Sequence, residues 1–235
     1  MTNKKTRMQI GKKPNSPLVF AREFFREFET TGTPFQTSHR AAFALTEPLR
    51  ERSRPLEILE LGAGLGAVTK QILKDMKPQD RLTVCEINPR LLAVLRLELA
   101  GRSDFIRNSG RIRFMDCAAQ HLPEDRKYDL VVCALPFLNF DLDTIRSIFS
   151  KLTSLSRPDT IMTSYEYIGF RSLNKIVSRV TGLGSIHEVD DFLSEIFKTG
   201  QGQTKDVWKH LLPIHIHRVT LGKIGNMAAQ EAKAA

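Results

Sequence analysis

Residues 55–70 read PLEILELGAGLGAVTK, and this stretch predicts the fold of the chain around it. The apolar run at residues 58–61 predicts a short buried strand, and the residues after Gly66 predict a helix. Gly62, Gly64 and Gly66 form the connection between the two. Because glycine has no Cβ atom, such a turn lets the backbone approach a ligand and aims the amino end of the next helix at it. The stretch therefore predicts a site for a nucleotide-type cofactor.

Strand and helix patterns alternate after this turn. Apolar runs predict strands at residues 56–61, 82–87, 111–115, 128–135 and 160–166. Helical spacing predicts helices at residues 67–76, 89–100, 142–155 and 189–197, and a shorter helix is compatible with residues 117–122. Two segments that flank Pro213, residues 204–209 and 214–221, predict a terminal antiparallel pair. The fold class is therefore α/β, with a mostly parallel sheet covered by helices on both faces.

Composition limits the class of protein. The 235 residues are 41% hydrophobic and 26% charged, as expected for a globular domain. No apolar run approaches the ~20 residues of a membrane span, and the charged amino terminus lacks the apolar core of a signal peptide. Cys85, Cys117 and Cys133 lack CxxC spacing and predict buried, reduced thiols in a cytosolic protein. The net charge of +9 suits an anionic partner, either nucleic acid or a membrane surface.

The chain divides into four parts: a flexible basic arm at residues 1–16, N-terminal helices at 17–54, the cofactor-binding domain at 55–222, and a tail at 223–235. Phe24 and Phe25 belong to an apolar face that recurs at helical spacing in residues 17–30. This face either packs on the domain or lies in a bilayer interface. The helix predicted at residues 39–52 follows two potential capping residues, Thr37 and Ser38, and Pro48 disfavours its last turns.

Acidic residues at the strand ends distinguish between cofactors. The glycine turn alone also fits a nicotinamide fingerprint, in which Ala67 is allowed at the last position. Glu60 directly precedes the glycines, where it can orient the loop or face a ligand ammonium. Glu86 ends the second strand and can accept both ribose hydroxyls, whichever the cofactor. Asp116 ends the third strand and residues 134–137 form a Pro-aromatic corner after the fourth, a combination that favours S-adenosylmethionine.

With these features in this order, residues 35–221 resemble the class I S-adenosylmethionine-dependent methyltransferases. The resemblance implies a Rossmann-like, mostly parallel seven-stranded sheet with a terminal antiparallel strand and N-terminal amphipathic helices. It also implies that the second-strand acid holds the ribose, and that Ile87 and Cys117 line the adenine slot. The implied cofactor-binding residues are Thr37, Ser38, Glu60, Gly62, Ala63, Gly64, Gly66, Glu86, Ile87, Asp116, Cys117, Ala134 and Leu135.

Two groups of methyltransferases look similar in the segments ELGAGLGAVTKQIL (60–73) and EINPRLL (86–92). One is the ribosomal RNA adenine dimethylases, and the other is the bacterial phospholipid and ornithine lipid N-methyltransferases. Adenine dimethylases carry a polar residue where this chain has Ala134, and alanine cannot hold an aromatic amine. The corner at 134–137 and the segments 163–167 and 207–213 resemble the lipid enzymes instead. The resemblance thus implies methylation of a headgroup amine, with RNA methylation or a non-catalytic binding role as alternatives.

A lipid ammonium must lose a proton before methylation, so the site needs a proton acceptor. Glu166 and Asp141 are the candidates. Phe137, Tyr165 and Tyr167 could line a cage for the methylated cation, although ordinary strand packing explains the two tyrosines equally well.

Membrane contact is the remaining expectation. Besides the phenylalanine-rich helix, residues 170–180 form a basic amphipathic segment with Arg171, Lys175 and Arg179 at four-residue intervals. The expected location is cytoplasmic, at the inner face of the cell membrane. The histidines at positions 210, 215 and 217 lack a carboxylate or cysteine at ligand spacing, so no metal is expected. His187 is expected in a loop.

Overall fold

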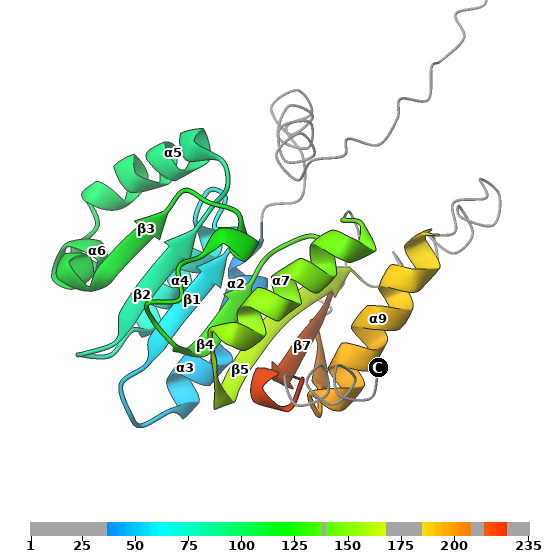
Figure 1. The fold of residues 1–235 in the computed structure, drawn as a ribbon. Helices are drawn as coiled ribbons and strands as arrows, with labels where there is room; N and C mark the ends of the chain where they lie inside the picture. Colours follow the sequence, from blue (N-terminus) through cyan, green and yellow to red (C-terminus); the bar gives the residue numbers. More distant parts are fainter. Residues whose placement is uncertain (1–36, 138–139, 168–184, 208–213, 225–235) are drawn as a thin grey trace, which may run out of the picture. The chain divides into compact units, whose positions relative to one another are not determined.

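The computed structural model describes residues 37–137, 140–167, 185–207 and 214–224 (Figure 1). These residues belong to a compact unit that spans 34–235. Several predictions concern residues outside the described ranges and stay predictions. They are the basic arm, the helix carrying Phe24 and Phe25, and the basic segment carrying Arg171, Lys175 and Arg179.

Seven strands of the described chain form one sheet in the order β3-β2-β1-β4-β5-β7-β6. Their bounds are β1 Glu57–Leu61, β2 Arg81–Cys85, β3 Ile112–Met115, β4 Tyr128–Cys133, β5 Ser156–Tyr167, β6 Gln203–Val207 and β7 Ile214–Thr220. Strands β1 to β5 are mutually parallel, whereas β7 runs antiparallel to both β5 and β6. The predicted Rossmann-like sheet and its terminal antiparallel pair are confirmed.

Helices cover both faces of this sheet (Figure 1). Their bounds are α2 His39–Leu45, α3 Glu47–Glu51, α4 Ala67–Asp75, α5 Pro89–Ala100, α6 Ser103–Asn108, α7 Leu142–Ser154 and α9 Ser185–Thr199, with short 3-10 turns at Ser109–Arg111 and Ala119–His121. Helices α7 and α9 bury their apolar residues in one core cluster. Helices α2, α4 and α5 bury theirs in a second cluster on the other face.

Alternation along the strands divides their side chains between these two clusters. In β1, Leu59 and Leu61 join the α7–α9 cluster, whereas Ile58 joins the α2–α4–α5 cluster. All six residues of β4 are buried. This two-sided burial explains why the parallel strands read as nearly continuous apolar runs.

Local details differ from the sequence predictions. The helix predicted at 39–52 is two helices, because Pro48 cannot occupy a helix interior but is tolerated in the first turn of α3. Helix α6 was not predicted, since six residues are too few to show a period. His187 lies within α9 and not in a loop, so that expectation was wrong. Residues 221–224 form a helical turn that buries Ile224, although the predicted tail includes this position.

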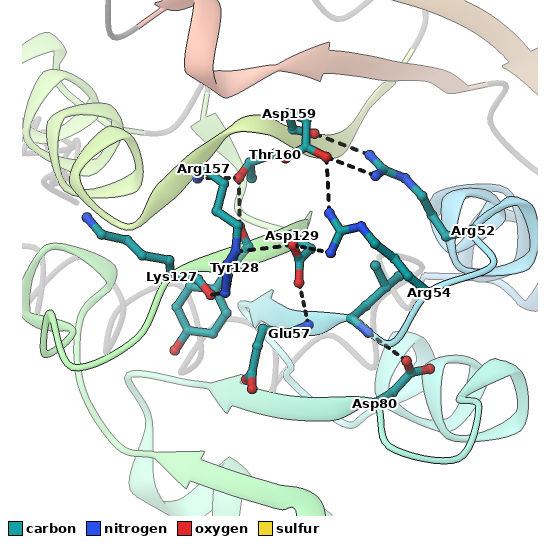
Figure 2. A network of polar contacts seen from close by, with 11 residues as sticks. Arg52, Arg54, Glu57, Asp80, Lys127, Tyr128, Asp129, Arg157, Asp159 and Thr160 are labelled. Atoms are coloured by element: carbon teal, nitrogen blue, oxygen red, sulfur yellow. Dashed lines mark hydrogen bonds and ion pairs between the residues drawn. The ribbon is translucent and has the colours of Figure 1, made fainter.

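A network of charged side chains connects the amino ends of three strands (Figure 2). The buried carboxylate of Asp129 accepts hydrogen bonds from Nη1 of Arg54 and the backbone N–H of Glu57, each at 2.8 Å. It also forms an ion pair with Nε of Arg157 at 3.2 Å. Asp159 in turn accepts a hydrogen bond from Nη2 of Arg54 at 3.0 Å. Because Glu57, Asp129 and Arg157 belong to β1, β4 and β5, the network fixes their alignment at the edge opposite the glycine turn.

Candidate functional site

The glycine turn joins β1 to α4 with all three glycines in the left-handed region, at φ values of +73°, +54° and +79°. A Cβ atom on Gly62 would lie 3.0 Å from Cδ2 of Leu135, and one on Gly66 would lie 2.1 Å from Cδ1 of Leu95. A Cβ atom on Gly64 would meet no atom within 4 Å. A Cβ atom at Gly62 or Gly66 would therefore displace a leucine side chain, whereas Gly64 leaves open space in which a ligand can approach the backbone.

Glu86 follows β2 and holds this turn in place. Its Oε2 accepts a hydrogen bond from the N–H of Gly64 and its Oε1 accepts one from the N–H of Asn88, both at 2.9 Å. Burial raises the pKa of Glu86, and hydrogen bonds from the N–H groups of Asn88, Gly64 and Ile87 oppose that rise. A carboxylate oxygen offers two lone-pair sites, so each retains one for a ligand hydroxyl. The carboxylate of Glu86 thus joins the turn to the residues that follow β2.

Glu60 lies beneath the turn, fully buried. Its Oε1 accepts a hydrogen bond from Oγ1 of Thr69 at 2.9 Å, whereas Oε2 has no hydrogen-bond partner among the described residues. Burial raises the pKa of Glu60 to about 8; the Thr69 hydrogen bond opposes this shift and the charge of Glu86 adds to it. A buried carboxyl group that lacks one partner suits a ligand that brings a positive charge. The hydrogen bond from Thr69 joins β1 to α4 below the turn, and Oε2 is the oxygen of this group with no described partner.

The end of β3 lies beside Glu86 at the same edge of the sheet. The N–H of Glu86 donates to the carbonyl of Met115 at 3.0 Å, which places the exposed Asp116 level with Glu86. Sγ of Cys85 donates to the carbonyl of Cys117 at 3.2 Å. A hydrogen bond from Cys85 lowers the pKa of the Cys117 thiol to about 7. Cys85 and Cys133 are buried as predicted, but Cys117 is only partly buried and all three are free thiols.

The corner after β4 continues the sheet for one residue and then turns. The N–H of Ala134 donates to the carbonyl of Leu61 at 2.9 Å, and the N–H of Phe137 donates to the carbonyl of Leu135 at 3.0 Å. Phe137 is buried with its ring centroid 5.4 Å from that of Phe149. Ala134 and Leu135 therefore border the glycine turn, whereas Phe137 belongs to the α7–α9 core.

The other predicted residues for which the structure gives contacts cap helices or pack in the core. Oδ1 of Asp141 accepts a hydrogen bond from the N–H of Thr144 at 2.7 Å and so caps α7. Oγ of Ser38 caps α2 by accepting from the N–H of Ala41 at 3.2 Å. Tyr165 packs against the α2–α4–α5 cluster, as the strand-packing alternative predicts. The structure does not bring Phe137 and Tyr165 together, because they lie in clusters on opposite faces of the sheet.

Glu166 has a partner that the sequence did not assign to it. Its Oε2 lies 3.4 Å from Nε2 of His217, and both side chains are about nine-tenths buried, at 11% and 10% exposure. The period-two spacing of His215 and His217 on a strand antiparallel to β5 was the available signal. Recognising it required the register between β5 and β7.

The described ranges lack two kinds of feature, a metal-binding cluster and a membrane-spanning helix. Those ranges contain no set of three His, Cys, Asp or Glu side chains placed to hold a metal ion. They also contain no helix long and apolar enough to cross a bilayer.

The central segment of the chain is similar to known proteins. Residues 58–159 match the family described as a methyltransferase domain. An ornithine lipid N-methyltransferase from Singulisphaera acidiphila is 31% identical over 101 residues, which cover 43% of this chain and 52% of that protein. The chain thus spans about half the length of this curated relative.

Solved structures with a similar fold include two O-methyltransferases. The enzyme from Bacillus cereus, described in complex with SAH, gives a TM-score of 0.58 at 14% identity, covering 91% of this chain and 93% of that one. A putative caffeoyl-CoA O-methyltransferase from Staphylococcus aureus gives 0.56 at 18% identity, covering 87% and 93%. At these identities the likeness concerns the fold.

Proposed function

We propose that the protein is an S-adenosylmethionine-dependent N-methyltransferase, from the match of residues 58–159 to the methyltransferase domain family and from the order of the strands in the sheet. Its acceptor is the amine of a membrane lipid headgroup, either phosphatidylethanolamine or ornithine lipid. The domain match supports methyl transfer. The similarity to an ornithine lipid N-methyltransferase supports the choice of acceptor.

The partnerless Oε2 of the buried Glu60 is the observation that carries the cofactor assignment. In this proposal Glu60 binds the ammonium of the methionine moiety, and the turn at residues 62–66 encloses that moiety. Glu86 accepts the ribose hydroxyls, and Asp116 faces the adenine amino group. S-adenosylmethionine supplies a methyl group on a positively charged sulfur, which an amine can displace. The remaining cofactor contacts are assigned to Thr37, Ser38, Ala63, Ile87, Cys117, Ala134 and Leu135.

Glu166 is the proposed proton acceptor. The ammonium of the headgroup has no lone pair, so it must lose a proton before nitrogen can attack the methyl group. Glu166 is the penultimate residue of β5, at the carboxyl edge of the sheet, two residues beyond the partner of Cys133. Asp141 is less suited, because its Oδ1 already caps α7. Most of the remaining catalysis comes from holding the amine in line with the sulfur–methyl bond.

Membrane contact completes the proposal. The net charge of +9 supports attraction to an anionic lipid surface. The proposed contacts are Phe24 and Phe25, in the helix that the sequence predicts at residues 17–30, and the basic segment at 170–180, with the protein peripherally associated at the cytoplasmic face. Charge reversal in that segment should weaken co-sedimentation with anionic vesicles, whereas unchanged binding would refute this contact. The residues to reverse are Arg171, Lys175 and Arg179.

The acceptor is tested by incubating the protein with methyl-labelled S-adenosylmethionine and one substrate at a time. The substrates are anionic vesicles containing ornithine lipid, the same vesicles containing phosphatidylethanolamine, and ribosomal RNA. We expect label in an amine lipid, and loss of labelling in Glu86→Gln, which keeps the side-chain shape but cannot accept both ribose hydroxyls as strongly. Label in RNA alone would establish the alternative acceptor. Failure to bind S-adenosylmethionine in calorimetry would indicate a non-catalytic protein.

A further inference from the structure

We propose that His217 is a positioning residue that orients Glu166 for removal of the proton from the acceptor ammonium. This inference rests on the proposed function, which supplies an amine acceptor. Nε2 of His217 lies 3.4 Å from Oε2 of Glu166. This nitrogen, Nε2 of His217, has no hydrogen-bond partner among the described residues. A buried imidazole nitrogen that lacks a hydrogen-bond partner requires an explanation beyond packing, because buried polar atoms in folded proteins are normally hydrogen-bonded.

The imidazole of His217 is held by other groups and not by Glu166. Its Nδ1 lies 3.1 Å from Oγ1 of Thr204 on β6. Its ring stacks on Phe197 of α9, with centroids 4.3 Å apart and an interplanar angle of 13°. When the Thr204 hydroxyl donates to Nδ1, the neutral ring carries its proton on Nε2, which faces Glu166. The histidine is therefore preorganised as a donor toward this carboxylate.

The pair lies at the edge of the sheet that carries the glycine turn. Cys133 at the end of β4 pairs with Ser164, so Glu166 extends two residues further along β5. The residues that follow Cys133 form the corner in which Leu135 packs against Gly62. One strand, β4, thus separates the Glu166–His217 pair from the turn proposed to bind the cofactor.

Another pair on the same face provides a matched comparison. Nδ1 of His215 lies 2.6 Å from Oδ1 of Asp206 on β6, and this pair is more exposed. The rings of His215 and His217 are 6.0 Å apart. Among the described residues, the groups with contacts to this pair of histidines come from β5 (Glu166) and β6 (Thr204 and Asp206), and the ring of Phe197 on α9 stacks on His217. His215 lies directly opposite Glu166 in the register of β5 and β7, but its imidazole forms its hydrogen bond with Asp206 of β6.

The proton step is balanced within the site. An N–H bond of the lipid ammonium breaks as an O–H bond forms on the Glu166 carboxylate, which becomes a neutral acid. The lone pair left on nitrogen forms the new N–C bond while the sulfur–methyl bond breaks and leaves its electron pair on sulfur. A donated N–H from His217 fixes one carboxylate oxygen and stabilises the ionised form that must accept the proton. Because such hydrogen bonds tighten in the reactive complex, 3.4 Å is a suitable starting separation.

The test compares His217→Leu, which removes the donor, with His217→Gln, which restores an N–H and is the milder change. His215→Leu is the matched control. Each variant is measured for kcat on ornithine lipid and phosphatidylethanolamine vesicles over a range of pH, and for S-adenosylmethionine binding by calorimetry. We expect kcat to fall about tenfold or more in His217→Leu with cofactor affinity unchanged. The acidic limb of its pH–rate profile should move to higher pH, and His217→Gln should recover part of both effects.

Three results decide the inference. A wild-type kcat and pH profile in His217→Leu would show that the pair only joins β5 to β7, and would overturn it. An equal loss in His215→Leu would also overturn it, because the effect would then not be specific to the partner of Glu166. A wild-type protein that binds the cofactor but methylates no amine lipid would refute the proposed function, and this inference with it.

Discussion

Replacement of Glu60 by glutamine is predicted to stabilise the cofactor-free protein as the pH rises. Burial raises the pKa of Glu60 from 4.5 to about 8 on folding. The folded protein therefore keeps a proton that the unfolded chain loses within this interval. The stabilising contribution of this proton is complete below about pH 4.5 and is lost as the pH rises through about 8. Within that interval the wild-type free energy of unfolding falls by about 1.4 kcal/mol per pH unit because of this group.

The magnitude follows from the difference between the two proteins. Glutamine does not titrate, and every other ionisable group is present in both chains. The free energy of unfolding of Glu60→Gln minus that of the wild type should therefore grow by about 3 kcal/mol between about pH 5.5 and about 7.5. A constant offset is expected as well, because the buried amide replaces a carboxyl group whose Oε2 has no described partner.

The assay is urea unfolding followed by circular dichroism at three pH values across this range, with calorimetric titration of S-adenosylmethionine on the same samples. Because the amide cannot become negative toward an ammonium, cofactor affinity should fall at least about tenfold. A variant that is more stable than the wild type but binds the cofactor more weakly indicates that the wild-type residue lowers stability in exchange for function. Parallel stability curves for the two proteins across the range would refute the reasoning.

The remaining predictions concern the turn, the charged network and one thiol. Gly66→Ala should lose about 2–5 kcal/mol of unfolding free energy from its left-handed φ and from the clash with Leu95, whereas Gly64→Ala should lose only about 1–2. Equal losses in urea unfolding would contradict this difference. Asp129→Asn should lose about 2 kcal/mol or more, since the buried charge is shared by two arginines and a backbone N–H. An unchanged urea midpoint would show that the network does not fasten the strands. With its pKa at about 7, Cys117 should be alkylated by iodoacetamide at neutral pH ahead of the two buried thiols, and S-adenosylmethionine should protect it. Peptide mass spectrometry that finds all three thiols equally modified would contradict this.

Short-range signals in the sequence predicted much of the fold. The strand, glycine turn and helix at residues 55–70 are a local unit, and the structure contains them as β1, the turn and α4. The number of strands and the terminal antiparallel strand came from the resemblance to a family, and the strand order was not predicted, because periodicity does not specify which strands are neighbours. Pro48 indicated disruption near the end of a helix, but not that the chain would form two helices meeting at Thr46.

The acidic residues of the candidate site were predictable because each lies at, or directly after, the carboxyl end of its own strand. Glu60, Glu86 and Asp116 meet at one edge because the carboxyl ends of parallel strands coincide. The pairing of Glu166 with His217 depends on a long-range antiparallel register that one sequence does not reveal. The separation of Phe137 from Tyr165 depends on which face each residue occupies, and this also follows only from the assembled sheet.

The central claim is that this chain transfers a methyl group to the nitrogen of a lipid headgroup. The most direct measurement supplies S-adenosylmethionine labelled with ¹³C in its methyl group, together with vesicles containing ornithine lipid or phosphatidylethanolamine, and locates the label in the extracted lipid by NMR. The account predicts a ¹³C methyl signal bonded to the headgroup nitrogen. A label on oxygen, or unlabelled lipid from a protein that binds the cofactor, would contradict it.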